Sequence, residues 1–327
     1  MPNEPRYPLL FEPVYKDYLW GGSRISQIYG RSGTPPVCAE SWEISTHPDG
    51  ESIVKNGAFS GARLSELVKA HGVALQGTRA GSGVFPLLIK IIDAAKILSV
   101  QVHPDDEAAA KFGGEPKTEM WYVLNAQPGA ELIMGLRPGT TPAECRRALQ
   151  AGDLNELLVK LPAEPNDAFY IPGGCVHALG AGCLILEVQQ TSNTTYRLYD
   201  WDRMDAAGNP RKLHIDQAFQ VIQWREEADV HGPADVLEQS ETVEKHLVCL
   251  SPYFRVERWI LREARAEAGM PETFQAFFCT RGEAEVVIAS GDAVKMGAGA
   301  SCLVPACVES FALHPSGMCE LLRITVP

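Results

Sequence analysis

Short apolar segments interrupted by glycine and proline restrict the possible folds of this sequence more than any other feature. The 327-residue chain contains 29 glycines and 23 prolines, and most apolar residues lie in runs of strand length. In 254–261 and 274–279, apolar and polar residues alternate with the period of two that is typical of half-buried strands. Many short strands joined by turns favour a sandwich or barrel over alternating βα units. We therefore expect a mainly β protein.

Helical patterns are confined to three segments. Residues 64–70 follow a Ser-Gly pair and predict a short helix. Residues 105–112 carry acidic side chains in the first turn and are followed by two glycines, as helix ends favour. Residues 141–160 begin with Thr-Pro-Ala-Glu and contain Gly152, so we expect two consecutive helices there.

A polar, acidic stretch, 225–244, is the best linker candidate and divides the chain into two predicted domains. The hairpins and glycines after it resemble a small cupin-type jelly roll. This part contains His314 but no His-x-His pair, so we expect it to hold no metal. The first part has a longer version of the same pattern. We therefore predict two cupin-like jelly-roll barrels or sandwiches with a few short helices, in domains 1–228 and 229–327, with the metal site in the first.

Four side chains in the first part are candidate metal ligands. Gln101 and His103 lie two residues apart on a predicted strand, so they leave the same face, and Pro104 ends that strand because it lacks a ladder N–H. Glu119 begins a second strand, and a Pro-Gly-Gly turn precedes His177. Such oxygen and nitrogen donors suit zinc. Each piece alone also occurs on exposed strands, but their joint occurrence is much rarer.

The nine cysteines show no CxxC spacing, and most lie beside apolar residues. We expect them to be reduced and buried as small apolar side chains. Cys175 and Cys183 flank His177 and are alternative ligands, although the four candidates above already complete a zinc coordination sphere.

The formal net charge of −12 argues against nucleic acids and anionic membranes as partners. No apolar run approaches the roughly 20 residues of a membrane helix, and the first residues lack the pattern of a signal peptide, so we expect a cytoplasmic protein. A phosphorylated substrate would need a local basic pocket. Lys90, Lys117 and Arg197 lie near the candidate ligands in sequence and could form it.

The run 187–203 places acidic, amide and basic side chains after an apolar strand. Glu187 and Gln189 share one face of that strand, and a buried carboxylate and amide need polar partners, so we expect them to line a wet cavity. Three charged residues follow: Arg197, Asp200 and Arg203. A solvated cluster of ion pairs on a loop is the alternative.

Six ordered blocks resemble the class I mannose-6-phosphate isomerases, in the short form that lacks an extra helical domain. The resemblance runs from about Tyr7 to the C-terminus. The blocks are Ala39–Ser45, Leu88–Asp93, Leu98–Asp106, Lys117–Tyr122, Tyr170–Gly180 and Glu187–Asp202. The resemblance implies a zinc-dependent aldose–ketose isomerase of carbohydrate metabolism that interconverts mannose 6-phosphate and fructose 6-phosphate through a cis-enediol.

The resemblance also implies roles for individual residues. The zinc ligands, one ion per chain, would be Gln101, His103, Glu119 and His177. The catalytic residues would be Arg197, Lys117 and Glu187. We expect the substrate to contact Lys90, Glu40, Trp42, Asn193 and Asp200. Asn193 stands where many relatives have aspartate, a residue considered for proton transfer, so that role must fall elsewhere or is not essential.

The implied reaction removes a proton next to a carbonyl and returns it to the neighbouring carbon. Zinc would polarise the two oxygens, and Arg197 would add positive charge where negative charge develops. Lys90 and Lys117 would orient the phosphate or the sugar oxygens. The base stays open among Glu187, His103 and zinc-bound hydroxide.

Two other classes of protein fit parts of the pattern. An Fe(II) cupin oxygenase could use His103, Glu119 and His177, and a non-catalytic sugar-phosphate-binding cupin protein could keep the fold. The full ligand set together with Arg197 and the lysines favours the isomerase. We expect a monomer or homodimer whose partner is a small-molecule sugar phosphate, and we assign no role to the second domain.

Overall fold

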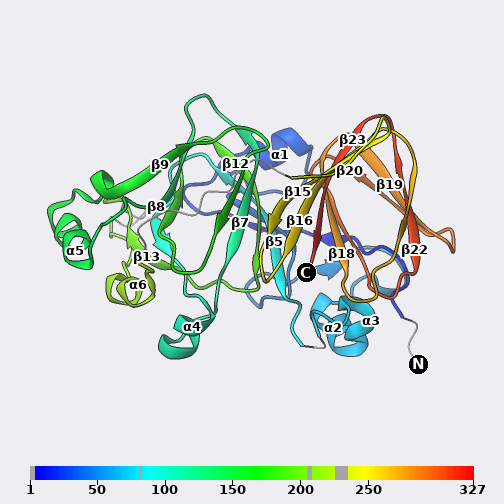
Figure 1. Cartoon of the computed structure of the whole chain (residues 1–327), viewed down its shortest axis with the longest axis horizontal. Helices are drawn as coiled ribbons and strands as arrows, with labels where there is room; N and C mark the ends of the chain where they lie inside the picture. The colour runs from blue at the N-terminus through cyan, green and yellow to red at the C-terminus, as the bar shows by residue number, and fades with distance from the viewer. Residues whose placement is uncertain (1–3, 82, 205–207, 225–234) are drawn as a thin grey trace. The chain divides into compact units, whose positions relative to one another are not determined.

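The computed structural model describes residues 4–81, 83–204, 208–224 and 235–327. In these ranges the chain is mainly β, which confirms the prediction, and its sheets pack as open sandwiches instead of closed barrels (Figure 1). The chain divides into two compact units. The first contains the described residues of 1–14, 42–89 and 232–327, and the second contains those of 15–41 and 90–231. The predicted boundary between 228 and 229 lies outside the described residues.

Two sheets carry most of the strands that precede residue 200. Their strands are β2 (Val14–Lys16), β3 (Glu40–Ile44), β5 (Leu87–Ala94), β6 (Val100–Val102), β7 (Glu119–Ala126), β8 (Glu131–Leu136), β9 (Leu158–Pro162), β10 (Ala168–Ile171), β11 (His177–Leu179), β12 (Cys183–Gln190) and β13 (Tyr196–Tyr199). One sheet has the order β10-β7-β12-β5-β3-β2, and the other has the order β13-β6-β11-β8-β9. The helices of the second unit are α1 (Arg24–Tyr29), α4 (Asp106–Phe112), α5 (Pro142–Ala151) and α6 (Ile215–Val221), with a 3₁₀ turn η2 (Leu154–Leu157).

Alternation along β6 decides what each face of the five-stranded sheet contacts. Val100 and Val102 are fully buried in a cluster with side chains of α4, α5 and α6, so these helices cover one face (Figure 1). Gln101 points to the opposite face. An apolar core on that side joins the two sheets and includes Trp121 of β7 and Met134 of β8. A one-residue slip of β6 would turn both valines away from the helices and Gln101 toward them, so the packing of the valines holds the register.

The first unit contains a sandwich of its own, built from two other sheets. Its elements are β1 (Phe11–Glu12), β4 (Ile53–Val54), η1 (Gly57–Phe59), α2 (Leu64–His71), α3 (Val73–Gln76), β14 (Asp235–Gln239), β15 (Val243–Leu250), β16 (Arg255–Leu261), β17 (Arg265–Ala268), β18 (Gln275–Arg281), β19 (Glu283–Ile288), β20 (Ala293–Gly297), β21 (Ser301–Val304), β22 (Ser310–Pro315) and β23 (Cys319–Thr325). A sheet of order β14-β15-β16-β23-β18-β21 packs on one of order β17-β22-β19-β20 (Figure 1). The buried core between them includes Trp259, Phe277 and Leu313.

Two of the helix predictions are confirmed, and the third is half wrong. Residues 64–70 and 105–112 correspond to α2 and α4, and residues 141–160 begin with α5. Gly152 ends α5 at a φ of +81°, and the expected second helix is only the turn η2. Residues 158–162 form β9, whose Leu161 pairs with Leu132 of β8. Pairing with a neighbouring strand overrides the local helical pattern there.

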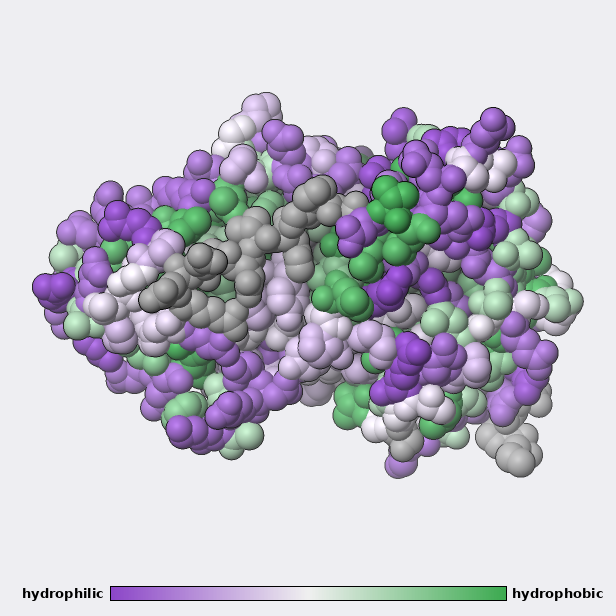
Figure 2. Space-filling view, in the orientation of Figure 1, coloured by the Kyte–Doolittle hydropathy of each residue, from purple (hydrophilic) through white to green (hydrophobic). Residues whose placement is uncertain are grey.

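The exposed surface agrees with the acidic composition. Most of the face drawn in Figure 2 is hydrophilic, and its hydrophobic residues gather in small groups. Among the described helices, none has the length and apolar character needed to span a bilayer. All nine cysteines are free thiols, and all but Cys175 and Cys307 are buried.

Candidate metal centre and active site

Three strands of the five-stranded sheet place polar side chains in one row. Arg197 of β13 is the register partner of Gln101 of β6, and Gln101 is the register partner of His177 of β11. Directly opposed residues project from the same face of a sheet, so the row points away from the helices and into the sandwich. His103 follows the end of β6, next to Pro104.

The turn before His177 requires glycine. A Cβ on Gly173 would lie 2.6 Å from the Cα of Asp105, closer than two carbon atoms can pack. Gly174 has a φ of +84°, and its N–H donates to the carbonyl of His103 over 2.7 Å. The Pro-Gly-Gly run therefore fixes the approach of His177 to the strand that carries the other imidazole.

The side chains of His103, Glu119 and His177 converge in a fully buried cluster, with all ligand atoms within 4.8 Å of one another. His177 Nε2 lies 3.2 Å from His103 Nε2 and 3.4 Å from Glu119 Oε1. His177 Nδ1 lies 2.9 Å from the carbonyl oxygen of Cys175, which can only accept, so Nδ1 holds the proton and Nε2 keeps a free lone pair. Neither of the cysteines considered as alternative ligands belongs to the cluster.

This cluster fits a metal ion. Glu119 Oε1 is buried and has no hydrogen-bond partner among the described residues, a costly state for an oxygen without a cation. Burial lowers the pKa of His103 well below its ordinary range, and burial together with Lys117 lowers the pKa of His177 to about 4. Both rings are therefore neutral at pH 7, as metal ligands must be. A set of imidazole, carboxylate and amide donors suits zinc.

Two buried lysines neutralise the carboxylates beside the cluster. Lys117 Nζ lies 2.5 Å from Glu119 Oε2 and 3.5 Å from Glu187 Oε1. Lys90 Nζ lies 3.0 Å from Glu187 Oε1 and 3.5 Å from Glu40 Oε1. Burial alone would lower the pKa of Lys90, but these two glutamates raise it above its ordinary value. Lys90 therefore keeps its charge, and buried carboxylates lie beside the ammonium groups of both lysines.

Glu187 is ionised although it is fully buried. Burial alone would raise its pKa, but Lys117 and Lys90 outweigh burial and hold the pKa at about 2, with help from the Trp121 indole N–H, which donates to Glu187 Oε2 over 2.8 Å. Glu187 and Gln189 were both expected to line a wet cavity, and of the two only Glu187 borders the cavity described below. On the same face, Gln189 donates to the carbonyl of Ser192 over 2.8 Å.

Lys90, Lys117 and Glu187 border a cavity of about 240 Å³ in the second unit. It is lined by Tyr18, Trp20, Glu40, Lys90, Ile92, Leu98, Ser99, Gln101, Lys117, Trp121, Leu179, Glu187, Asn193, Thr195, Arg197 and Arg211. The structure thus gathers Gln101, the two lysines, Glu40, Glu187, Asn193 and Arg197 around one space, and their roles at the substrate and the metal stay predictions.

Two residues expected at the substrate do not line this cavity. The buried Trp42 lies in the first unit, where its ring packs against Gly50 and meets the ring of His47 edge-on at 6.0 Å. The carboxylate of Asp200 is bound by Arg211 and by Arg203. Direct substrate contacts by Trp42 and Asp200 stay predictions.

The sequence reasoning missed Arg211, Ser99 and Trp121 as lining residues. Ser99 lies two residues before Gln101, so the strand period alone placed it on the same face. Trp121 likewise lies two residues after Glu119. Arg211 follows a polar, glycine-containing stretch that shows no periodicity, and no sequence signal pointed to it.

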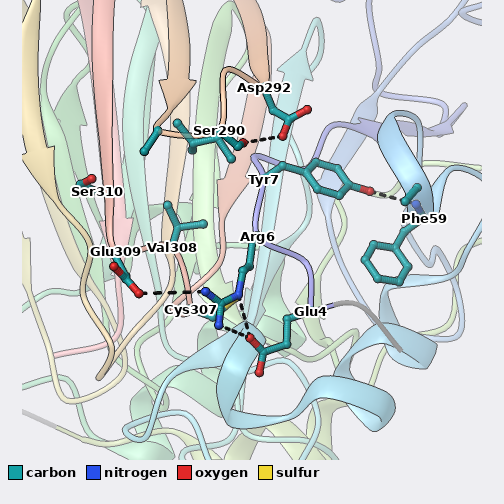
Figure 3. Close-up of a pocket in the computed structure, with 13 residues that line it drawn as sticks. Glu4, Arg6, Tyr7, Phe59, Ser290, Asp292, Cys307, Val308, Glu309 and Ser310 are labelled. Carbon is teal, nitrogen blue, oxygen red and sulfur yellow. Dashed lines mark hydrogen bonds and ion pairs between the residues drawn. The ribbon is translucent and has the colours of Figure 1, made fainter. Parts of the chain in front are cut away.

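The first unit contains a larger cavity of about 530 Å³, bordered by Glu4, Tyr7 and Phe59 among others (Figure 3). Its charged side chains are exposed and pair with each other, as Arg6 does with Glu4 and, at 4.0 Å, with Glu309. Exposed ion pairs of this kind contribute little to the stability of the fold. The described lining includes none of the site residues predicted from the sequence, so volume alone does not locate the active site.

Comparisons with known proteins agree with the geometry. Residues 9–139 match the family model of the type I phosphomannose isomerase catalytic domain, and residues 243–326 match that of the mannose-6-phosphate isomerase cupin domain. The chain is 37% identical to a probable mannose-6-phosphate isomerase of Bacillus subtilis, over 97% of this chain and 98% of that protein. It is 42% identical to the mannose-6-phosphate isomerase of Streptococcus mutans, over 77% of this chain and 78% of that protein.

Solved structures give the same result. The crystal structure of mannose 6-phosphate isomerase from Bacillus subtilis superposes with a TM-score of 0.87 at 31% identity, over 97% of this chain and 99% of that chain. Likeness in sequence and in fold therefore extends over almost the whole chain. The resemblance drawn from the six sequence blocks is confirmed, and the chain belongs to the type I mannose-6-phosphate isomerases, a family of enzymes.

Proposed function

We propose that this chain interconverts mannose 6-phosphate and fructose 6-phosphate through a cis-enediol, with one zinc ion held by Gln101, His103, Glu119 and His177. The observation that carries the proposal is the buried ligand cluster beside a cavity that also holds two lysines and an ionised glutamate. When bound, zinc would act as a Lewis acid toward the sugar oxygens.

Glu187 is the residue that we propose to move the proton. It lines the cavity in its ionised form, whereas His103 Nε2 is directed at the ligand cluster. In the forward direction the Glu187 carboxylate would take the proton from C2 of the open-chain aldose and return it to C1. The hydroxyl proton of O2 would pass to O1, so that the C1 carbonyl becomes a hydroxyl and a carbonyl forms at C2. Lys117 and Lys90 lower the basicity of Glu187. If their ammonium groups turned to substrate oxygens, they would stabilise the Glu187 carboxylate less, and the basicity of Glu187 would rise.

The cations around the cavity would stabilise the charge that develops on O1 and O2. Lys117 and Lys90 are held at fixed positions by buried carboxylates, so little reorganisation accompanies the reaction. Arg197 donates from Nε to Ser99 Oγ over 3.3 Å and from Nη1 to the carbonyl of Lys212 over 3.0 Å, which orients its guanidinium at the cavity wall. Asn193 on the same wall can donate to and accept from sugar hydroxyls.

The direct test is conversion of fructose 6-phosphate to mannose 6-phosphate by purified protein, before and after chelation. We expect conversion that is abolished by the chelator and restored by zinc. Conversion that persists after complete metal removal would refute the metal dependence. If zinc-loaded protein binds the sugar phosphate but does not convert it, the reading as a sugar-phosphate-binding protein replaces the isomerase.

A further inference from the structure

The positive charges around the cavity fall into two groups. Lys90 and Lys117 lie within 3.5 Å of three buried carboxylates, so the lysine side has no excess of positive charge. Arg197 and Arg211 line another part of the same cavity. In the part of the chain that the structure describes, Arg197 forms no ion pair with a carboxylate, and its guanidinium donates to a hydroxyl and to a backbone carbonyl. Excess positive charge therefore lies on the arginine side.

Arg211 is fixed in place by one buried carboxylate. Its Nε donates to Asp200 Oδ2 over 2.6 Å and its Nη2 donates to Asp200 Oδ1 over 2.5 Å, a bidentate pair with a side chain that is only 5% exposed. Asp200 is shared with Arg203, so a single negative charge faces two guanidinium groups. Arg203 also donates to the carbonyl of Ile97 and does not line the cavity.

A phosphate dianion needs this kind of site. Two guanidinium groups that share one carboxylate leave a net positive charge, and Arg197 adds another. Arg197 and Arg211 line the same cavity, and burial and the charge of Arg211 both lower the pKa of Arg197. An anion placed between them would relieve the repulsion between their charges, and a planar guanidinium fork matches phosphate oxygens.

We propose that Arg211 binds the phosphate group of the substrate, and that Asp200 is a positioning residue that holds Arg211 at the cavity wall. The inference rests on the proposed function and refines it, because it separates an arginine side for the phosphate from a lysine side for the reacting carbons. It also gives Asp200 a role other than direct substrate contact, since a carboxylate would repel a phosphate.

Arg211→Gln and Arg203→Gln form a matched pair for the test. Both remove one guanidinium from Asp200, but only Arg211 lines the cavity. We expect Arg211→Gln to raise KM for mannose 6-phosphate by about 10- to 100-fold, the range of one lost charged hydrogen-bond pair, with kcat within about threefold of the parent. The inhibition constant of inorganic phosphate should rise by a similar factor. Arg203→Gln should change both by a clearly smaller factor, because Arg203 lies outside the cavity and acts on it only through Asp200.

A positioning role for Asp200 makes its own prediction. Asp200→Asn keeps the size of the side chain but removes the charge, so KM should rise while kcat is retained, and Arg211→Lys should restore part of the affinity lost in Arg211→Gln. Parental KM and phosphate inhibition in Arg211→Gln would overturn the proposal. Equal effects of the two glutamine variants would also overturn it, because the cluster would then act only through the stability of the loop.

Failure of this proposal can be told apart from failure of the proposed function. If the parent protein does not isomerise the sugar phosphate, binding of mannose 6-phosphate is measured by calorimetry on the same zinc-loaded variants. Weaker binding in Arg211→Gln alone would support the phosphate role, and unchanged binding would refute it, whatever the chemistry.

Discussion

Replacement of Trp121 by phenylalanine tests whether Glu187 acts as an oriented carboxylate. The indole N–H of Trp121 donates to Glu187 Oε2 over 2.8 Å, and neither side chain is more than 2% exposed. The indole also meets the ring of His177 edge-on, with centroids 5.5 Å apart. Phenylalanine keeps most of the apolar packing and removes the donor.

The expected magnitude follows from the type of bond. A hydrogen bond to a charged group contributes about 1.5–3 kcal/mol, so the free energy of unfolding should fall by about 2 kcal/mol. Loss of the donor raises the pKa of Glu187, but the larger causes of its low pKa, Lys117 and Lys90, remain, so the carboxylate stays ionised at pH 7. The activity loss should therefore come from a less well-oriented base, and we expect kcat to fall by about tenfold.

The first unit provides a matched control. Trp259 Nε1 donates to Glu257 Oε2 over the same 2.8 Å, again between buried side chains, and neither residue lines the active-site cavity. Trp259→Phe should cost a similar free energy of unfolding and leave kcat unchanged. The assays are the initial rate of sugar-phosphate conversion at saturating substrate, zinc content, and the thermal unfolding midpoint.

The comparison between the two variants decides the outcome. If Trp121→Phe keeps the parental kcat with zinc bound, Glu187 does not depend on its indole partner, and the reasoning is refuted. If both variants lose activity in proportion to their loss of stability, the effect is one of folding and not of orientation.

Two further predictions follow from the packing and the pKa shifts. Gly173→Ala places a Cβ 2.6 Å from the backbone of Asp105 and displaces the turn before the ligand cluster. The affinity for zinc, measured in competition with a chelating dye, should therefore fall by about 10-fold or more. Gly297→Ala is the control, because its Cβ enters open space and the affinity for zinc should stay unchanged. Burial opposes ionisation of Glu257, but Arg323 and the other partners outweigh it and hold its pKa below the ordinary 4.5. Its contribution to stability is therefore present above about pH 4.5 and lost as the pH falls through the lower folded-state value. Glu257→Gln should be less stable than the parent at pH 7, and the difference in unfolding midpoint should shrink below pH 4.5; a constant difference would contradict the assignment.

The candidate ligands were predictable because the pattern that carries them is local. Strand alternation predicts that Gln101 and His103 leave the same face, and the Pro-Gly-Gly run predicts a tight turn before His177. The structure brings His103, Glu119 and His177 within 4.8 Å. The residues 158–162 were mistaken for helix because their short apolar pattern is ambiguous, and only pairing with β8 decides it.

Other residues of the site could not be predicted, because they lie far along the chain from the residues that they contact. Arg211 is recognisable only because Asp200 holds it at the cavity wall, and its sequence neighbours resemble those of an ordinary polar loop. The same applies to the first unit, in which Leu9 exchanges backbone hydrogen bonds with Leu303, a pairing that no local pattern predicts.

The sequence by itself determined the mainly β fold, the candidate metal ligands and the turn glycines, because backbone sterics and strand period act over a few residues. The tertiary structure decided which lysine neutralises which glutamate and which of the arginines lines the cavity. It also decided that Trp42 is not among the residues that line that cavity and that its ring packs against Gly50. Those outcomes depend on burial and on distances between segments far apart in the chain, and Coulombic interactions and hydrogen bonds change steeply with distance.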